Sequence, residues 1–205
     1  MTMRIYTEII NRIIRVRSFT SYLEIGVFKP TYNFDSITCD FKMGVDPATR
    51  APNVLQVTSD KFFQYNQTKF DLVFVDGDHS YEQTKKDMEN ALRATKAGGC
   101  ILVHDCNPAS KELAAPTQFS PETPWCGEVY RAYAEFTASL PYDSCCLDIQ
   151  HGLGLIDIGQ SSGRRRRKIP HLTWEDFSAD RSKWLNLRSV EEWLNQMRGA
   201  EKAVG

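Results

Sequence analysis

Two short polar segments carry the residue types that could do chemistry. The segment DGDH, residues 76–79, directly follows the apolar run Leu72–Val75, and the segment HDCN, residues 104–107, follows Cys100–Val103. Carboxylates can hold a divalent cation, and an imidazole can exchange a proton near neutral pH. Short apolar runs bounded by polar groups are typical of buried strands in a parallel sheet. The sequence therefore predicts two buried strands, each ending in an acid and an imidazole.

The residues between these segments predict a helix that connects the two strands. Ser80 followed by Gln83 has the spacing of a capping box, which predicts a helix start. An apolar stripe at spacings of three and four continues to Leu92, and Gly98-Gly99 is expected to end the helix. A strand, helix and strand in this order form a right-handed crossover with parallel strands. Both acidic ends then lie at the sheet edge where open α/β sheets bind ligands.

The first strand is predicted over residues 21–27, and it contains an acid near its end. Burying Glu24 is costly unless a partner compensates it, so it is either a ligand-binding residue or a glutamate hydrogen-bonded to nearby backbone N–H groups. Gly26 would allow a ligand to approach the backbone closely.

Two further polar positions follow the next predicted strands. Asp46 ends the strand over residues 42–45 and lies about 20 residues past Gly26, the spacing of a carboxylate that binds ribose hydroxyls. A turn-forming Asp-Pro is the alternative interpretation. Ser59 and Asp60 follow a strand over residues 53–57, where they either contact a ligand or cap a helix.

Length and composition favour a single soluble domain over residues 1–205, with an N-terminal helix in 1–19 and a basic loop and helical extension in 160–205. The net charge is −1, which disfavours nucleic acid as a partner, and the longest apolar runs are of strand length, which excludes a membrane span. The six scattered cysteines favour free thiols and a cytoplasmic location. A homo-oligomer is left open.

Five segments in order produce a family resemblance that covers residues 20–107 well. They are YLEIGV, MGVDP, VTSDKFF, FDLVFVDGDHSYEQ and GGCILVHDC. Together they resemble the class I S-adenosylmethionine-dependent methyltransferases, above all a small bacterial and phage-like group with a DGDHSYE segment. The resemblance implies an α/β, Rossmann-like, mostly parallel seven-stranded sheet with helices on both faces and an antiparallel last strand. It also implies S-adenosylmethionine as cofactor and a small-molecule acceptor, with a hydroxyl as the expected methylation site.

The resemblance also implies a role for each matching position. Glu24 and Gly26 would lie near the methionine end of the cofactor, and Asp46 would bind the ribose hydroxyls. Ser59 and Asp60 would lie beside the adenine. Asp76 would be the acid at the tip of the fourth strand, with His79 just beyond it. The chain departs from the family where further glycines usually follow the first strand, because Lys29-Pro30 stands there. An atypical loop, a truncated following helix and weakened cofactor affinity are therefore expected.

Methyl transfer needs a positioned acceptor and a group that takes its proton. His79 is the best-matched base, and Asp105 and His104 are the other candidates. Asp76 and Asp105 could also hold a divalent cation such as Mg²⁺, as in metal-dependent O-methyltransferases, with Asn107 or waters as further ligands. Because side chains alternate along a strand, only one of His104 and Asp105 is expected to face the site, and we expect it to be Asp105.

Two alternatives belong to other functional classes. A nicotinamide dehydrogenase would need GxGxxG after the first strand, and this chain has a single glycine there. A non-catalytic Rossmann-like binding module would keep the fold without cofactor turnover, and it could bind a partner through the basic tract 164–168, although a solvated loop is the preferred interpretation of that tract. The acceptor, the choice between O- and N-methylation and metal dependence are not readable from the sequence.

Overall fold

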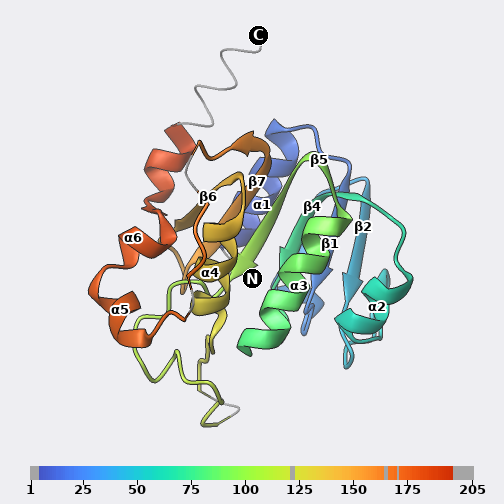
Figure 1. Ribbon diagram of the computed structural model, residues 1–205. Helices are drawn as coiled ribbons and strands as arrows, with labels where there is room; N and C mark the ends of the chain where they lie inside the picture. The colour runs from blue at the N-terminus through green and yellow to red at the C-terminus, as the bar shows by residue number, and fades with distance from the viewer. Residues whose placement is uncertain (1–4, 121–122, 164–165, 170, 196–205) are drawn as a thin grey trace.

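One mixed sheet with the strand order β3-β2-β1-β4-β5-β7-β6-β8 organises the molecule (Figure 1). The computed structural model describes residues 5–120, 123–163, 166–169 and 171–195. The strands are β1 Ser21–Ile25, β2 Phe41–Val45, β3 Val54–Leu55, β4 Phe70–Val75, β5 Thr95–His104, β6 Tyr142–Leu147, β7 Leu153–Ser161 and β8 Leu187–Arg188.

Helices cover both faces of this sheet. They are α1 Ile5–Val16, α2 Ser59–Tyr65, α3 Tyr81–Ala94, α4 Val129–Ser139, α5 Trp174–Ala179, α6 Arg181–Leu185, a helix over 190–195, and two 3₁₀ turns at Pro30–Tyr32 and Phe34–Ser36. Alternate side chains of β4 divide the core: Leu72 and Phe74 lie with the isoleucines of α1, while Val73 and Val75 lie with α3 and α4. Among the described helices, none has the length and apolar character needed to cross a bilayer.

The predicted fold class is confirmed, with one difference in the strand count. Strands β1, β2, β4 and β5 are parallel, and β7 runs antiparallel to both β5 and β6. The additional strand is β8, a two-residue segment that pairs with β6 through Cys146 and Leu187. It lies in the C-terminal extension, where two residues are too few to produce a period-2 pattern.

The register of the parallel strands aligns their carboxyl ends. Ile25 is opposite Val45 on one side and Val75 on the other, and Val75 is opposite Val103. The residues that follow these partners therefore lie side by side at one sheet edge, in the order Asp46, Gly26, Asp76 and His104.

Two local predictions around α3 are wrong. Ser80 is the N-cap residue of α3, but its side chain makes no capping bond, and Gln83 instead donates to Ser59 and Asp60 at the start of α2. The helix ends at Ala94, and the two glycines lie within β5, because Gly99 packs closely against the backbone of the neighbouring strand. In both cases, a contact between distant segments of the chain determines the structure instead of the local sequence pattern.

Two other helix starts are capped by side chains. Ser189 and Glu192 form a reciprocal capping box, with the Glu192 N–H donating to Ser189 Oγ at 3.1 Å and the Ser189 N–H donating to Glu192 at 2.8 Å. The cap of α2 is Thr58, whose hydroxyl accepts the Lys61 N–H, one residue before the predicted position.

Gly26 has no room for a side chain. Its φ is +87°, and a Cβ placed on it would lie 2.1 Å from the carbonyl oxygen of Asp76. The backbone of the adjacent strand end therefore approaches this glycine closely, and the close approach of a ligand at Gly26 stays a prediction.

We expect Gly26→Ala to lower the free energy of unfolding far more than Gly98→Ala does. Gly98 has a similar φ of +80° and open space around it, so alanine there carries only the left-handed backbone cost of about 1–2 kcal/mol. Denaturant unfolding of both variants separates the backbone cost from the clash. Equal losses in the two variants would contradict the close contact between β1 and β4.

Candidate active site

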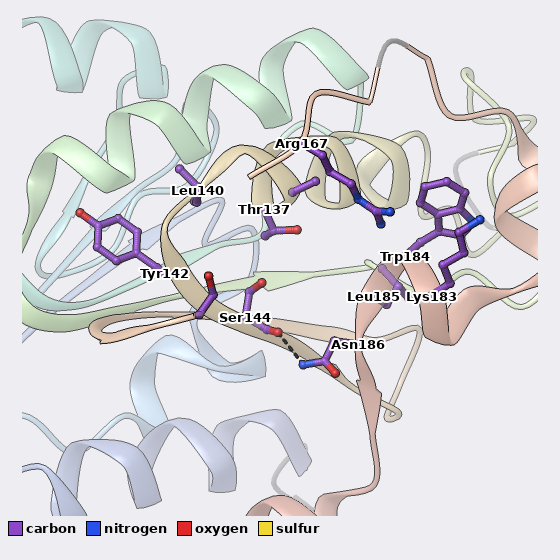
Figure 2. Close-up of a pocket in the computed structure, with 11 residues that line it drawn as sticks. Thr137, Leu140, Tyr142, Ser144, Arg167, Lys183, Trp184, Leu185 and Asn186 are labelled. Atoms are coloured by element: carbon purple, nitrogen blue, oxygen red, sulfur yellow. Dashed lines mark hydrogen bonds between the residues drawn. The ribbon is translucent and has the colours of Figure 1, made fainter. Parts of the chain in front are cut away.

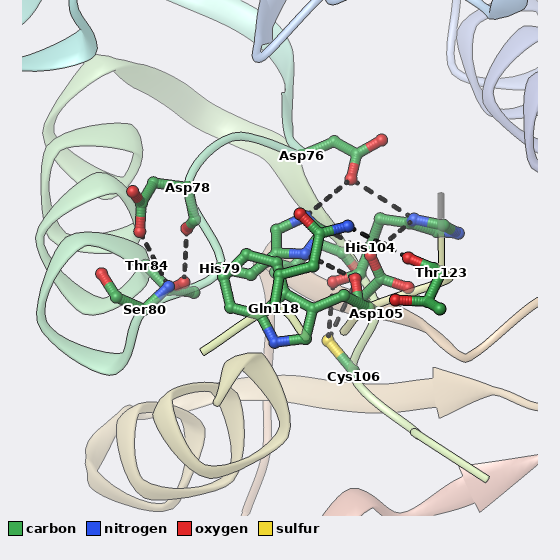
Figure 3. A network of polar contacts seen from close by, with 12 residues as sticks. Asp76, Asp78, His79, Ser80, Thr84, His104, Asp105, Cys106, Gln118 and Thr123 are labelled. Atoms are coloured by element: carbon green, nitrogen blue, oxygen red, sulfur yellow. Dashed lines mark hydrogen bonds and ion pairs between the residues drawn. The ribbon is translucent and has the colours of Figure 1, made fainter. Parts of the chain in front are cut away.

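Two carboxylates and two imidazoles meet at the ends of β4 and β5 (Figure 3). The His104 Nδ1 atom lies 3.3 Å from Asp76 Oδ1 and 3.3 Å from Asp105 Oδ2. The His79 Nε2 atom lies 3.4 Å from Asp105 Oδ2 and 3.7 Å from Asp76 Oδ1. We call these four residues the acid–histidine cluster.

The backbone at Asp105 explains why both members of the His-Asp pair face this cluster. Its φ is +61°, so the chain leaves the extended conformation directly after β5. The alternation expected along a strand stops there, and the prediction that only Asp105 faces the site is wrong. His104 also contacts helix α1, where its ring centroid lies 4.9 Å from that of Tyr6.

The residues just before α4, 123–128, fix the orientation of His79. Its Nδ1 atom lies 2.9 Å from the backbone carbonyl oxygen of Trp125, and the two rings stand 5.3 Å apart. The Trp125 indole N–H in turn donates to the carbonyl of Ala115 at 2.7 Å. A hydrogen bond from Nδ1–H to this carbonyl leaves Nε2 as the atom that faces the two carboxylates.

Charge compensation dominates the electrostatics of the cluster. Burial lowers the pKa of His104, but Asp76 and Asp105 outweigh burial and raise it to about 10. Burial likewise lowers the pKa of His79, and its bonds to the same two carboxylates shift it above its ordinary value. Burial raises the pKa of Asp76, yet the two imidazoles hold that pKa well below its usual range. Without a metal, the positive charge is supplied by protonated histidines.

Three members of the cluster could hold a metal ion. One ligand atom from each of Asp76, His79 and Asp105 lies within 4.8 Å of the others. The imidazole was not predicted as a ligand from the sequence. Asn107, which was expected to help, is engaged elsewhere: its carbonyl oxygen accepts from Arg181 at 2.6 Å, and its amide donates to Asp148 at 3.1 Å.

Cys126 is a neighbour of the cluster that sequence reasoning missed. Its buried thiol hydrogen-bonds Asp105, and burial together with this carboxylate raises the pKa of the thiol well above its ordinary value. Cys126 therefore stays a neutral donor. No local pattern pointed to it, because the contact depends on how residues 123–128 lie against the ends of β4 and β5.

The carboxylate of Asp46 is largely used by the backbone. One oxygen, Oδ2, accepts the Phe28 N–H at 2.8 Å, and the other accepts the N–H groups of Ala48 and Thr49, each at 2.8 Å. Asp46 therefore has the turn-forming role considered from the sequence. One acceptor position of Oδ2 is left, so binding of a ribose hydroxyl stays a prediction.

Glu24 is buried in a network of side chains rather than backbone groups. Its Oε2 accepts the Tyr22 hydroxyl at 2.6 Å and the Asn33 amide at 2.8 Å, and Thr7 of α1 donates to Asn33 at 2.8 Å. The expected backbone partners are wrong. Tyr22 lies two residues before Glu24 on the same strand face, a spacing that the sequence already contained.

The loop after β1 is atypical, as predicted from Lys29-Pro30. Two 3₁₀ turns, Pro30–Tyr32 and Phe34–Ser36, replace a long helix, and Asn33 sits between them. Ser59 and Asp60 both contact Gln83, and Asp60 also pairs with Lys86 at 2.6 Å, so their predicted place beside an adenine is untested by these contacts.

We expect Glu24 to make stability fall as pH rises. Burial raises its pKa from 4.5 to about 8, so the folded state binds a proton that the unfolded state releases between these values. The stabilisation present below pH 4.5 is lost as pH rises through about 8, by up to roughly 5 kcal/mol. Denaturant unfolding of the wild type and of Glu24→Gln, which cannot titrate, isolates this effect. A constant difference between the two proteins from pH 5 to pH 9 would contradict it.

Comparisons with known proteins address the fold and one segment of the sequence. Residues 33–106 match a family model described as a methyltransferase domain. Among solved structures, the SAH-bound methyltransferase PaMTH1 of Podospora anserina is 17% identical with a TM-score of 0.55, covering 77% of this chain and 79% of that one. The O-methyltransferase TomG of Streptomyces achromogenes, in complex with SAM, is 15% identical with a TM-score of 0.52, covering 74% and 78%.

A third similar structure is an O-methyltransferase from Bacillus cereus in complex with SAH, which is 12% identical with a TM-score of 0.50 and covers 74% of this chain and 80% of that one. A search of curated proteins found no match. The chain therefore has the class I methyltransferase fold and carries, over residues 33–106, the sequence pattern of a methyltransferase domain.

Proposed function

We propose that this protein is an S-adenosylmethionine-dependent methyltransferase that methylates a hydroxyl group of a small molecule. The observation that carries the proposal is the acid–histidine cluster at the carboxyl edge of a methyltransferase fold. Open α/β sheets bind ligands at this edge, where the strand order reverses, which here is between β1 and β4. The SAM and SAH complexes of TomG and PaMTH1 support the choice of cofactor.

The residues at that edge fit the cofactor. Asp46, Gly26 and Asp76 follow register partners on three adjacent strands, so they form a continuous border. Asp46 keeps one acceptor position on Oδ2 that a ribose hydroxyl could use. Glu24 of β1 and the loop with Asn33, which consists of two short turns, border the proposed site of the methionine end.

The cluster also fits a divalent cation, held by Asp76, His79 and Asp105. Such an ion would lower the pKa of a bound acceptor hydroxyl, so that a weaker base suffices. A mixed set of two carboxylates and one imidazole suits Mn²⁺ or another transition metal better than Mg²⁺, which prefers oxygen ligands. From the sequence alone, Mg²⁺ was the cation considered. We now favour Mn²⁺ or another transition metal because the imidazole of His79 is one of the three ligands.

His79 can use its Nε2 atom for only one of two roles. In the metal-free cluster, Asp76 and Asp105 raise the pKa of His79 and favour the protonated ring, which cannot accept a proton. We therefore propose His79 as a metal ligand and the second carboxylate oxygen of Asp105 as the nearest proton acceptor. Residues 123–128, fixed to His79 through Trp125, would cover the acceptor and exclude water.

We expect S-adenosylhomocysteine to bind the purified protein with micromolar affinity and one-to-one stoichiometry in a calorimetric titration. NADH is the matched control, because a dinucleotide should not bind without a glycine-rich turn. Absence of heat with S-adenosylhomocysteine, in a protein shown to be folded, would favour the non-catalytic binding module.

We expect Asp105→Asn to weaken Mn²⁺ binding at least tenfold, because one ligand loses its charge. Asp78→Asn is the matched control, since Asp78 is exposed and accepts the Ser80 N–H instead of facing the cluster. His79→Ala should weaken Mn²⁺ binding as well if His79 is a ligand. Calorimetric Mn²⁺ affinities that are equal in all four proteins would refute the metal site.

A further inference from the structure

A second concave site lies at the opposite end of the sheet from the acid–histidine cluster. It is a cavity of about 370 Å³ between the end of α4, the start of β6 and helix α6 (Figure 2). Its walls include Thr137, Leu140, Tyr142, Arg167, Trp184 and Asn186.

The position of this cavity separates it from the proposed active site. Helix α4 begins beside His79, where the Glu128 N–H donates to the His79 carbonyl, and its far end contributes Thr137 and Leu140 to the cavity. Eleven residues of α-helix span roughly 16 Å. A ligand in this cavity would therefore not touch the acid–histidine cluster.

The charge of the lining is entirely positive. Arg167 and Lys183 are both lining residues, and no aspartate or glutamate lines the cavity. Both cations lie over the indole of Trp184, at 5.4 Å and 4.6 Å from its centroid. Within the described part of the chain, neither forms an ion pair with a carboxylate. Two like charges on one ring repel each other, and an anion between them would relieve that repulsion.

The walls are held in place before any ligand binds. The Asn186 amide donates to the Ser144 carbonyl at 2.8 Å, which joins the end of α6 to β6, as Figure 2 shows. The Arg167 N–H donates to the Ala138 carbonyl at 3.0 Å, and the Trp184 indole N–H donates to the Asp176 carbonyl at 2.9 Å. These bonds fix both the arginine backbone and the plane of the ring.

Polarity changes from the mouth of the cavity to its floor. Arg167 and Lys183 are exposed, whereas Leu185 is 2% exposed and Thr137 is 9% exposed. Leu140 and Tyr142 add half-buried apolar surface between them. A ligand that fits this gradient has an anionic group at the mouth and an apolar body inside.

We propose that this cavity binds a small organic anion, in which a phosphate or carboxylate group meets Arg167 and Lys183 and a flat apolar body occupies the interior. The volume lies within the range of about 300–1,000 Å³ that small-molecule sites occupy. Charge-assisted bonds from a guanidinium and an ammonium make the anionic group the main determinant of affinity. Binding should therefore weaken as salt increases.

The test is a fluorescence titration of the full-length protein with 1-naphthyl phosphate and 1-naphthoate at low ionic strength. Naphthalene-1-methanol is the uncharged probe of the same body. The double variant Arg167→Gln/Lys183→Gln removes both cations, and Lys69→Gln/Arg93→Gln removes two exposed cations elsewhere. In that control pair, the Lys69 ammonium donates to the Arg93 carbonyl.

We expect at least one charged probe to bind the wild type and the control variant alike, and to bind the Arg167→Gln/Lys183→Gln variant at least tenfold more weakly. The preference between phosphate and carboxylate identifies the anionic group. Ala138→Phe, which adds bulk at a lining position, should weaken binding without removing charge. The proposal is overturned by affinities unchanged in Arg167→Gln/Lys183→Gln, by equal binding of the uncharged probe, or by no binding of either charged probe at millimolar concentration.

Discussion

The in-register parallel pairing of β1, β4 and β5 is the constraint on which the candidate active site depends. Because Ile25, Val75 and Val103 are register partners, the residues that follow them meet at one edge. A shift of one residue would turn the strand faces over and separate the carboxylates from the imidazoles. The contact between Gly26 and the Asp76 backbone restricts such a shift, since this position leaves no space for a side chain.

Charge balance is the second constraint on this edge. A buried carboxylate, Asp105, and a half-buried one, Asp76, cannot lie so close together without positive charge between them. His104, which packs against α1, supplies part of this charge, and His79, which is bonded to Trp125, supplies the rest. A divalent cation would satisfy the same need, which is why one cluster supports both a metal-free state and the proposed metal-bound state. The bond between His79 and the Trp125 carbonyl extends this dependence to residues 123–128.

The sequence predicted the features that follow from strand periodicity. The buried strands, their polar ends and the parallel order all depend on local patterns of apolar residues. The acid–histidine cluster was predicted in part, because the residues at strand ends share an edge. The atypical loop after β1 could also be expected, since Lys29-Pro30 replaces residues with greater backbone freedom.

The remainder depends on contacts between distant segments. The left-handed backbone of Asp105 brings His104 and Asp105 to one side, and no pattern in the sequence signals that conformation at an aspartate. Gln83 bonds across to α2 instead of capping its own helix. Glu24 bonds Asn33 between the two 3₁₀ turns, and Thr7 of α1 in turn bonds Asn33. The cavity lined by Arg167 and Lys183 is assembled from α4, β6, α6 and the segment that contains Arg167.

The most direct measurement of the central claim is a crystal structure of the protein grown with S-adenosylhomocysteine and MnCl₂, with anomalous data collected for manganese. The account predicts the nucleoside across the ends of β1, β2 and β4, with its sulfur facing the acid–histidine cluster. It also predicts one anomalous peak coordinated by Asp76, His79 and Asp105. A structure in which this edge stays empty while both compounds are present in excess would contradict the account.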